Sequence, residues 1–252
     1  MIRRVIILTD ITDVGKTEMA LRISDAELND RVEIHFVKVK KFSIVNTIFL
    51  FRLLFDSAIE GDIFLVVMDP RYNSKSRESL YVRTKNNINC FIPNNGIISW
   101  VLNDFGIKDS YLIPVNQDNK DFPTFNGKYK YAPAINSFLK DINFVEKLTK
   151  FSIKDIVTTN INEGEVVHID NYGNLKVYFS DKNIYKKENI KVNINDKEVD
   201  VKLSYDFNVS EDGTPVFYSG SSLDGLLELA LIRDSFAEKF NVEIGDVIKI
   251  RE

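Results

Sequence analysis

The stretch IFLVVMDP, residues 63–70, decides the fold class of this chain. Its first six residues are apolar without interruption, which is typical of a strand that is buried on both faces in a parallel sheet. The run stops abruptly at Asp69 and Pro70. A second apolar run, Val5–Thr9, stops in the same way at Asp10. Two buried strands, each followed directly by an acid, are therefore expected in the first part of the chain.

The segments between these two runs predict helices and a further strand. Lys16–Ser24 and Ile44–Ile59 place apolar residues at helical intervals, and Gly61 is positioned to end the second helix. Val32–Val39 has a strand pattern. Strand, helix and strand in this order imply a parallel α/β sheet. Because ligands of open parallel sheets bind outside the carboxyl ends of the strands, the two acids that follow the buried strands indicate a candidate site.

The remainder of the first part continues this mixed pattern. Ser79–Thr84 and Asn89–Ile92 predict a pair of strands. Pro123–Lys130 is expected to be a loop, and Tyr131–Leu139 to open a helix after Pro133. We therefore expect an N-terminal α/β domain with a mainly parallel sheet, over residues 1–152.

The second part of the chain, residues 153–252, predicts a smaller, β-rich and barrel-like domain. Leu227–Phe240 is the one segment there whose spacing indicates a helix. Short strands are expected at Glu165–Ile169, Leu175–Phe179, Ile190–Ile194, Glu198–Leu203, Val216–Tyr218 and Val247–Ile250.

The composition excludes several classes of function. The 252 residues carry a formal net charge of −4 and a pI near 5.4, which gives no electrostatic footprint for nucleic acid. Cys90 is the only cysteine, and His35 and His168 share no metal-ligand spacing, so neither a disulfide framework nor a metal site is expected. The most apolar run, Ile44–Phe55, is too short to span a bilayer. The N-terminal MIRRVIILTD lacks a cleavable signal pattern, so a cytoplasmic location is expected.

The stretch GEVVHIDNYGNLK, residues 164–176, predicts a hairpin with an acid at its tip. Asn171–Asn174 has the composition of a turn and offers a glycine for a positive φ. Asp170 then lies at a strand end beside Tyr172 and the amide of Asn174, a group suited to an ammonium and a flat ring. The alternative is an ordinary solvated hairpin tip.

A short phosphate-binding motif is suggested by Gly15-Lys16-Thr17, and we reject it. The phosphate loop needs a glycine five residues before the Gly-Lys pair, so that backbone N–H groups can surround the phosphate, and position 10 is Asp. The three residues are expected instead at the N-terminus of an ordinary helix.

Seven motifs occur in a fixed order along the chain, and together they resemble one family. They are LTD at 8–10, VVMDP at 66–70, Arg77 in RESLYV, PNNG at 93–96, TFNG…YAP at 124–133, IDNYGNL at 169–175, and LLELA followed by IGD near the end. This set resembles the S-adenosylmethionine (SAM) hydroxide adenosyltransferases, also called adenosine-forming SAM hydrolases, which are relatives of the fluorinase and chlorinase. The resemblance covers nearly the whole chain.

The resemblance implies attack of water or hydroxide at C5′ of SAM, with methionine as the leaving group. SAM is then the substrate, and no cofactor is implied. By the family pattern, Asp10 holds the ribose diol and Asp170 pairs with the methionine ammonium. Asn174 and Ser222 meet polar atoms of the methionine end, and Tyr172 forms an aromatic wall.

Further roles follow from the same resemblance. Asp69 orients and deprotonates the attacking water, and Arg77 stabilises the developing hydroxide. Adenine lies near Leu231–Arg233, which makes Arg233 a substrate-binding candidate, as is Asn95 of the PNNG segment. The fluorinase branch carries tyrosine where Asp69 stands, so this chain is more similar to the hydrolases.

This sequence departs from the family pattern at the histidine of the catalytic set, which is Asn126 here. Asparagine can hold a hydrogen-bonded water but does not titrate near neutral pH. Two hypotheses follow: an enzyme that hydrolyses SAM, and a module of the same fold that binds SAM or adenosine with little turnover. Methyl transfer ranks below both, because no second-substrate signature is present. The resemblance also implies a homotrimer in which the N-terminal domain of one subunit faces the C-terminal domain of its neighbour.

Overall fold

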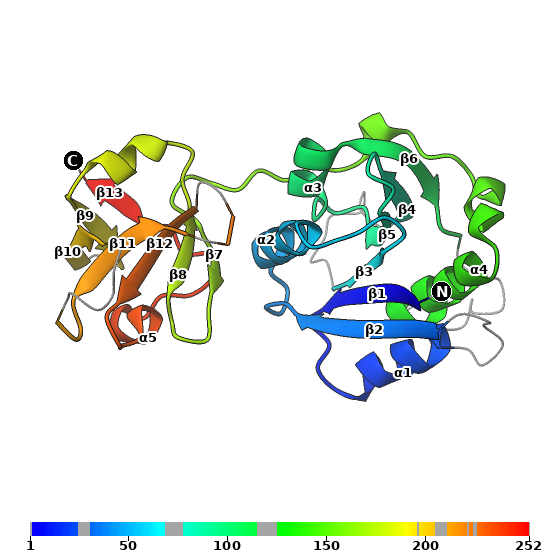
Figure 1. The fold of residues 1–252 in the computed structure, drawn as a ribbon, viewed down its shortest axis with the longest axis horizontal. Coiled ribbons are helices and arrows are strands. Elements are labelled where there is room, and N and C mark those ends of the chain that lie inside the picture. The colour runs from blue at the N-terminus through cyan, green and yellow to red at the C-terminus, as the bar shows by residue number, and fades with distance from the viewer. Residues whose placement is uncertain are drawn as a thin grey trace. The chain divides into compact units, whose positions relative to one another are not determined.

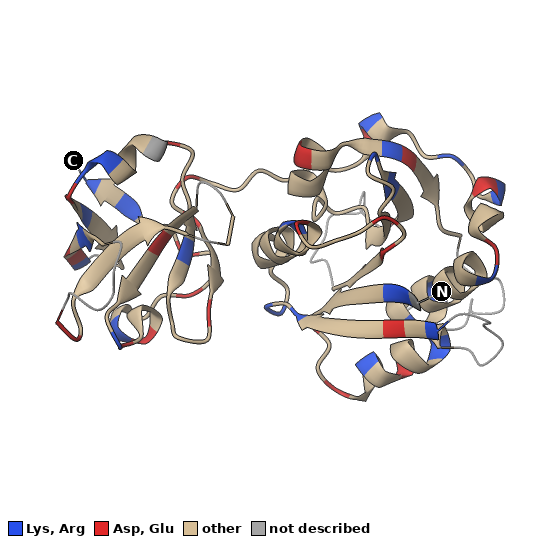
Figure 2. Cartoon of the chain, in the orientation of Figure 1, with Lys and Arg blue, Asp and Glu red and all other residues tan. Residues whose placement is uncertain are grey.

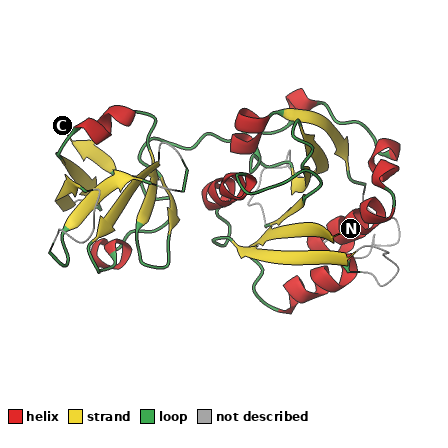
Figure 3. Ribbon diagram, viewed as in Figure 1, coloured by secondary structure: helices red, strands yellow, loops and turns green. Residues whose placement is uncertain are grey.

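The structure is a computed structural model that describes residues 2–24, 31–68, 78–114, 125–195, 197–204, 211–220, 222–223 and 226–251. The chain divides into two compact units, Met1–Thr159 and Asn160–Glu252, each with its own core (Figure 1). Unit 1 mixes helices and strands, whereas unit 2 consists mainly of strands (Figure 3).

Unit 1 is built on a six-stranded sheet with the strand order β2-β1-β3-β5-β4-β6. The pairs β1–β2, β1–β3 and β3–β5 are parallel, and β4 runs antiparallel to both β5 and β6. The prediction of a mainly parallel sheet is therefore confirmed. The strands are β1 (Ile2–Thr9), β2 (Arg31–Lys38), β3 (Ile63–Val67), β4 (Ser79–Thr84), β5 (Asn89–Pro93) and β6 (Ile107–Leu112).

Helices cover both faces of this sheet. Successive residues of β3 enter opposite cores: Leu65 packs in one cluster with residues of α1 and α4, and Val66 packs in another with residues of α2 and α3. This two-sided burial is the reason that the IFLVVM stretch is apolar throughout. The helical segments are α1 (Val14–Ile23), α2 (Ile44–Phe55), α3 (Ser99–Phe105), the π-helix η2 (Gly127–Tyr131), α4 (Ala132–Lys140), and the 3₁₀ helices η3 (Ile142–Lys147) and η4 (Ile153–Asp155).

The second predicted helix ends earlier than expected. It ends at Phe55, and the chain leaves it through tight turns in which the N–H groups of Ser57 and Ala58 bond to carbonyls three residues back. Ile59 is 62% exposed, so the apolar spacing that suggested a longer helix did not extend into the core. Gly61 has φ of 90° and lies in the turn before β3.

The prediction of a loop over Pro123–Lys130 is wrong for its last residues. Gly127–Lys130 belong to the π-helix η2, which continues directly into α4. A side chain at Gly127 would place Cβ 2.4 Å from Met19 Sδ and 3.0 Å from a methyl carbon of Val67. Glycine therefore lets this turn of helix pack tightly against α1 and β3, a tertiary contact that overrides the local propensity for a loop.

Unit 2 is a curled, barrel-like sheet of seven strands with the order β13-β9-β10-β11-β12-β8-β7 (Figure 1). The β10–β11 pair is parallel, and the other pairs are antiparallel. This confirms the predicted β-rich architecture. The elements are β7 (Val166–Ile169), β8 (Leu175–Tyr178), the 3₁₀ helix η5 (Lys182–Lys186), β9 (Asn189–Ile194), β10 (Lys197–Leu203), β11 (Pro215–Ser219), β12 (Leu226–Leu231), α5 (Phe236–Phe240) and β13 (Lys249–Arg251).

The helix predicted over Leu227–Phe240 is wrong for its first half. Leu226–Leu231 forms β12, which lies between β11 and β8 and is buried at every position. A short apolar run that is buried on both sides has the same sequence signature in a strand as in a helix. Only Phe236–Phe240 is helical.

Cys90 lies in β5 and is fully buried in unit 1. Burial without a charged partner raises the pKa of its thiol well above the ordinary value, so the thiol stays protonated. Among the residues that the structure describes, no helix combines the length and apolar character needed to cross a membrane.

Candidate functional site

The hairpin between β7 and β8 places a carboxylate in a rigid set of hydrogen bonds. Asp170 Oδ1 accepts from the backbone N–H groups of Tyr172 at 2.9 Å and Asn174 at 3.0 Å, and Oδ2 accepts from the Asn174 side-chain amide at 3.0 Å. Gly173 provides the left-handed residue of the turn, with φ of 82°. The structure thus brings together Asp170 and Asn174, which the sequence placed at one tip.

The protonation state of Asp170 follows from these contacts. Burial on its own raises the pKa of this carboxyl, but the bonds from the Asn174 and Tyr172 amides and the charge of Lys176 outweigh it. The net result is a pKa below the ordinary value for aspartate. Asp170 is therefore an ionised acceptor at neutral pH.

A row of polar side chains crosses the sheet beside this carboxylate. His168, Lys176, Glu228 and Tyr218 are successive cross-strand neighbours on β7, β8, β12 and β11. The Lys176 and Glu228 side chains are only 8% and 3% exposed and form an ion pair, and Lys176 Nζ also lies 3.4 Å from Asp170 Oδ2. A basic band on β8 beside an acidic band on β12 marks this pair in Figure 2.

Together with Asp170, the row carries one uncompensated negative charge among the described residues. Burial lowers the pKa of His168, and Lys176 lowers it further against the opposing effect of Asp170 and Glu228, so the imidazole is neutral at pH 7. Burial, reinforced by Glu228, raises the pKa of the Tyr218 hydroxyl. The charged groups are then the Asp170 and Glu228 carboxylates and the Lys176 ammonium. Their net negative charge makes this part of unit 2 suited to a cationic group.

Lys176 and Glu228 were missed by sequence reasoning. The two residues form an ion pair although they are 52 positions apart in the sequence, and no local pattern predicts such a contact. The signal that was present is a charged residue within an apolar strand, in LKVY and in LLELAL. Such a residue must be paired when it is buried.

Ser222 lies at the edge of the same network. Its hydroxyl donates to Glu228 Oε1 at 3.5 Å. A Cβ atom at position 220 would lie only 2.4 Å from the same oxygen. Glycine at this position therefore leaves room for the Glu228 carboxylate. The structure therefore gathers Ser222 with Asp170 and Asn174 through the Lys176–Glu228 pair.

The two remaining candidates of unit 2 lie on its surface. Tyr172 is 72% exposed, and its backbone N–H donates to the Asp170 carboxylate. Arg233 pairs with Asp212 at 2.9 Å, and both of these side chains are 69% exposed. The contact of Arg233 is therefore with a surface acid and not with the Asp170 network.

In unit 1, Asp10 follows β1 at the carboxyl edge of the sheet and is only 9% exposed. Its Oδ2 accepts from the backbone N–H of Phe42 at 3.3 Å. Oδ1 makes no hydrogen bond with any residue in the described ranges. One oxygen of a buried carboxylate thus remains available as an acceptor.

Asn126 is exposed and immediately precedes η2. Because Gly127 packs against Val67, the last residue of β3, Asn126 is held next to the carboxyl end of that strand. Asp69 and Arg77 follow β3 in the sequence but lie outside the described residues, so their placement relative to Asn126 stays a prediction.

The PNNG segment has a structural role that the sequence did not indicate. Asn94 accepts from the N–H of Val157 at 2.8 Å and donates to Glu78 at 3.0 Å, so it attaches the end of unit 1 to the sheet. Asn95 is buried, and its side-chain nitrogen has no hydrogen-bond partner among the described residues. A buried donor without a partner costs about 1–3 kcal/mol.

The chance phosphate motif lies at the start of α1, as expected. Asp13 caps this helix, and its Oδ1 accepts from the N–H of Gly15 at 2.9 Å. A carboxylate therefore already occupies the helix N-terminus. Within the described ranges, no group of three or more His, Cys, Asp or Glu side chains is arranged to hold a metal ion.

Two family models match the chain. The model described as the SAM hydroxide adenosyltransferase N-terminal domain matches residues 5–147, and the model of the C-terminal domain matches residues 164–249. Each match falls within one of the two compact units.

Individual proteins show the same relationship. A Methanocaldococcus jannaschii protein named (R)-S-adenosyl-L-methionine hydrolase is 24% identical over 194 residues, which are 75% of this chain and 71% of the relative. The crystal structure of an uncharacterized conserved protein from Thermotoga maritima has a TM-score of 0.80 at 20% identity and covers 98% of this chain and 100% of its own. A conserved hypothetical protein from Thermus thermophilus reaches 0.71 at 18% identity, with 99% and 100% covered. At these identities the two structures show a shared fold.

Proposed function

This chain belongs to the SAM hydroxide adenosyltransferase family, and we propose that it hydrolyses S-adenosyl-L-methionine to adenosine and L-methionine. The family includes a protein named as a SAM hydrolase, which supports this type of reaction. In the proposed reaction, a water oxygen attacks C5′ of the ribose and loses a proton. The C5′–S bond breaks, and its electron pair returns to sulfur as methionine leaves.

The observation that carries the proposal is the ionised Asp170 carboxylate of unit 2. SAM has a sulfonium, an ammonium and a carboxylate, and therefore carries one net positive charge. The Asp170 network carries one net negative charge, since Lys176 compensates only one of its two carboxylates. Two amides already fix the Asp170 orientation, so an ammonium meets a pre-organised acceptor.

In unit 1, Asp10 Oδ1 suits a hydroxyl of the ribose as an acceptor. Oδ2 can accept a second hydroxyl if its long 3.3 Å hydrogen bond from the Phe42 N–H breaks. We assign Asp69 the role of the base that takes the proton of the water, and Arg77 the stabilisation of the hydroxide. Asn126 holds the water by a hydrogen bond. A sulfonium is a good leaving group, so the site needs mainly to orient the water and exclude bulk solvent.

The direct test is to incubate the purified chain with SAM and measure adenosine and methionine by chromatography and mass spectrometry. The two sulfur epimers of SAM are tested separately, because the relative is named for the (R) form. Equal amounts of adenosine and methionine support the proposal. Methylthioadenosine in place of adenosine, or no product with either epimer, contradicts it.

A second candidate function is binding of SAM or adenosine with little turnover. The observation that favours it is Asn126, an exposed amide at the position next to β3 where the resemblance places a histidine. An amide cannot accept a proton near neutral pH. Calorimetric binding of SAM without release of adenosine over many hours would select this function.

We also propose that the active form is a trimer, with each ligand contacted by unit 1 of one copy and unit 2 of another. The reason is that the ribose and water candidates all come from unit 1, whereas the methionine candidates all come from unit 2. Pockets between domains or subunits are common sites for such ligands. Light scattering tests this: a stable monomer that still binds SAM contradicts it.

A further inference from the structure

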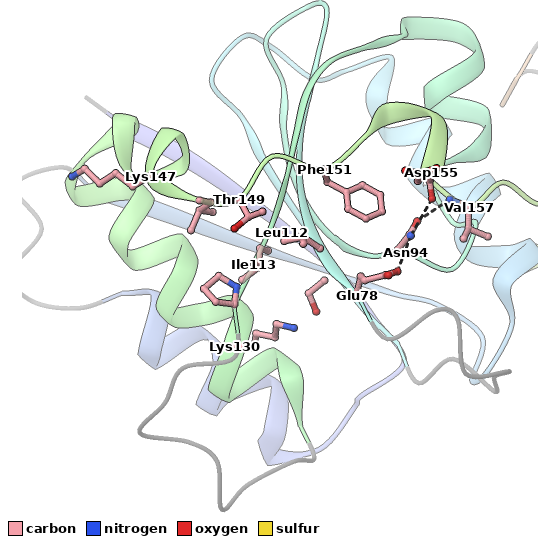
Figure 4. A pocket seen from close by; sticks show the side chains of 13 residues that line it. Glu78, Asn94, Leu112, Ile113, Lys130, Lys147, Thr149, Phe151, Asp155 and Val157 are labelled. Carbon is pink, nitrogen blue, oxygen red and sulfur yellow. Dashed lines mark hydrogen bonds between the residues drawn. The ribbon is translucent and has the colours of Figure 1, made fainter.

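Unit 1 contains a pocket of about 1000 Å³ that lies apart from the Asp170 network of unit 2. It lies between the start of β4, the end of β6, the π-helix η2 and the segment after η3 (Figure 4). None of the eight candidate residues that the structure describes is among its lining residues. The described residues that line it all belong to unit 1.

One side of the pocket presents an ammonium that has no counter-ion among the described residues. Lys130 is half-buried on η2, and Figure 4 shows its side chain reaching into the pocket. Its amine makes no hydrogen bond or ion pair with any residue in the described part of the chain. Burial lowers the pKa of this amine, and no carboxylate of the described residues opposes that effect. By contrast, Lys128 on the same π-helix pairs with Glu18.

The opposite charge lies on the same pocket. The Glu78 carboxylate is oriented by Asn94, whose amide donates to Oε2 at 3.0 Å, and Oε1 remains available among the described contacts. The other cation of the lining, Lys147, is already paired with Asp141 at 2.9 Å. The other acid of the lining, Asp155, is exposed. Lys130 and Glu78 are therefore the two charged groups of the lining that combine partial burial with free bonding capacity.

An apolar wall completes the pocket. Leu112, Phe151 and Val157 are among the residues that line it (Figure 4). We propose that this pocket binds a small α-amino acid with an apolar side chain, with its carboxylate on Lys130, its ammonium on Glu78 and its side chain on this wall. Pairing of opposite charges at both ends of one small molecule gives the orientation that a single ion pair cannot give. The proposal does not depend on the SAM reaction.

The test uses L-leucine and its two truncated analogues with the full-length protein. The analogue 4-methylpentanoate lacks only the ammonium, and 3-methylbutylamine lacks only the carboxylate. Calorimetry should show that leucine binds at least tenfold more tightly than either analogue, since each analogue loses one charge-assisted hydrogen bond. Equal affinity of leucine and 4-methylpentanoate would overturn the proposal, and so would the absence of leucine binding at millimolar concentration.

Variants then locate the site. Lys130→Met should lower leucine affinity tenfold or more, and Glu78→Gln should do so for leucine but not for 4-methylpentanoate. Lys128→Met is the matched control, because it removes a lysine from the same helix that points to Glu18. NMR signals of the lysine Cε methylene groups provide a readout on the unaltered protein. Leucine should shift the Lys130 signal, and a shift of other lysines alone would overturn the assignment even if the variants fail to fold.

Discussion

Lys176 on β8 and Glu228 on β12 form an ion pair directly across two neighbouring strands, and both side chains are almost completely buried. The same ammonium lies 3.4 Å from Asp170, the acid at the hairpin tip. A buried ion pair of this kind contributes little net stability, but removing one partner leaves the other charge buried alone. The pair therefore makes the sheet sensitive to single substitutions at either end.

Lys176→Met should destabilise unit 2 by about 3–5 kcal/mol, because it leaves the Glu228 carboxylate buried without a cation. Hydrogen exchange of the β8 and β12 amides measures this locally. The double variant Lys176→Met/Glu228→Gln is the control and should regain most of the loss, since no charge is then left unpaired. Two additive losses would show that the ion pair is not coupled.

Asp170→Asn should weaken SAM binding by about tenfold to a hundredfold, because a neutral amide replaces the charged acceptor for the ammonium. Adenosine has no ammonium, so its affinity should not change. Calorimetry with both ligands makes the comparison in one protein preparation. An equal loss for SAM and adenosine would mean that Asp170 acts only by holding the hairpin together.

The hairpin should also depend on pH through Asp170. Its pKa is lowered in the folded chain, so its contribution to stability is complete above the unfolded value of about 3.9 and is lost as the pH falls through the lower folded value. The protection of the Tyr172 and Asn174 amides, corrected for intrinsic exchange, should therefore fall below about pH 4. Asp170→Asn should remove this pH dependence. Protection that falls equally in that variant would assign the effect to another carboxyl.

Asp10→Ala should weaken adenosine binding by about 1–3 kcal/mol, the value of the hydrogen bonds that a carboxylate accepts. Asp10→Asn is the informative companion, since it keeps an acceptor for the Phe42 N–H and therefore the loop geometry. Calorimetry with adenosine and 2′-deoxyadenosine reports whether a ribose hydroxyl is the partner. Unchanged adenosine affinity in Asp10→Ala would remove this residue from the site.

Asn126→His should raise the rate of adenosine release if the missing histidine limits turnover, by up to about a hundredfold for a positioned base or acid. The residue is exposed, so the change should not disturb the fold. Rates are measured from pH 5 to 9, because a histidine effect must follow its own titration. Asp69→Asn is the negative control that lacks the proposed base. A flat profile without any gain would mean that Asn126 is suited to its present role.

The fold was predictable where one segment determined its own environment. IFLVVM predicted a buried parallel strand correctly, and so did Val5–Thr9, because both runs are short, rich in β-branched residues and followed directly by an acid. Prediction failed where the tertiary context decides. LLELAL is a strand only because β11 and β8 flank it, and the π-helix before α4 depends on the contact of Gly127 with Met19 and Val67.

The candidate site divides in the same way. Asp170 and Asn174 are four residues apart, so the turn alone indicated that they would meet. Lys176 and Glu228 belong to two strands whose pairing the sequence does not specify, and the spacing around Glu228 predicted a helix. Asn95 is a candidate through its motif, and only the structure shows that its amide nitrogen is buried without a partner in the described part of the chain.

The burial of Cys90 has a practical consequence for following the two halves of the chain separately. Cys90 and Trp100 are the only cysteine and tryptophan in the sequence, and both lie in unit 1. A thiol reagent can reach Cys90 only when the centre of the six-stranded sheet opens. The rate of thiol labelling therefore measures the opening of unit 1 alone. Fluorescence of the single indole gives an independent signal from the same unit. An unfolding transition that is seen by circular dichroism but changes neither signal must then arise in unit 2. The two units can therefore be followed separately in the intact chain.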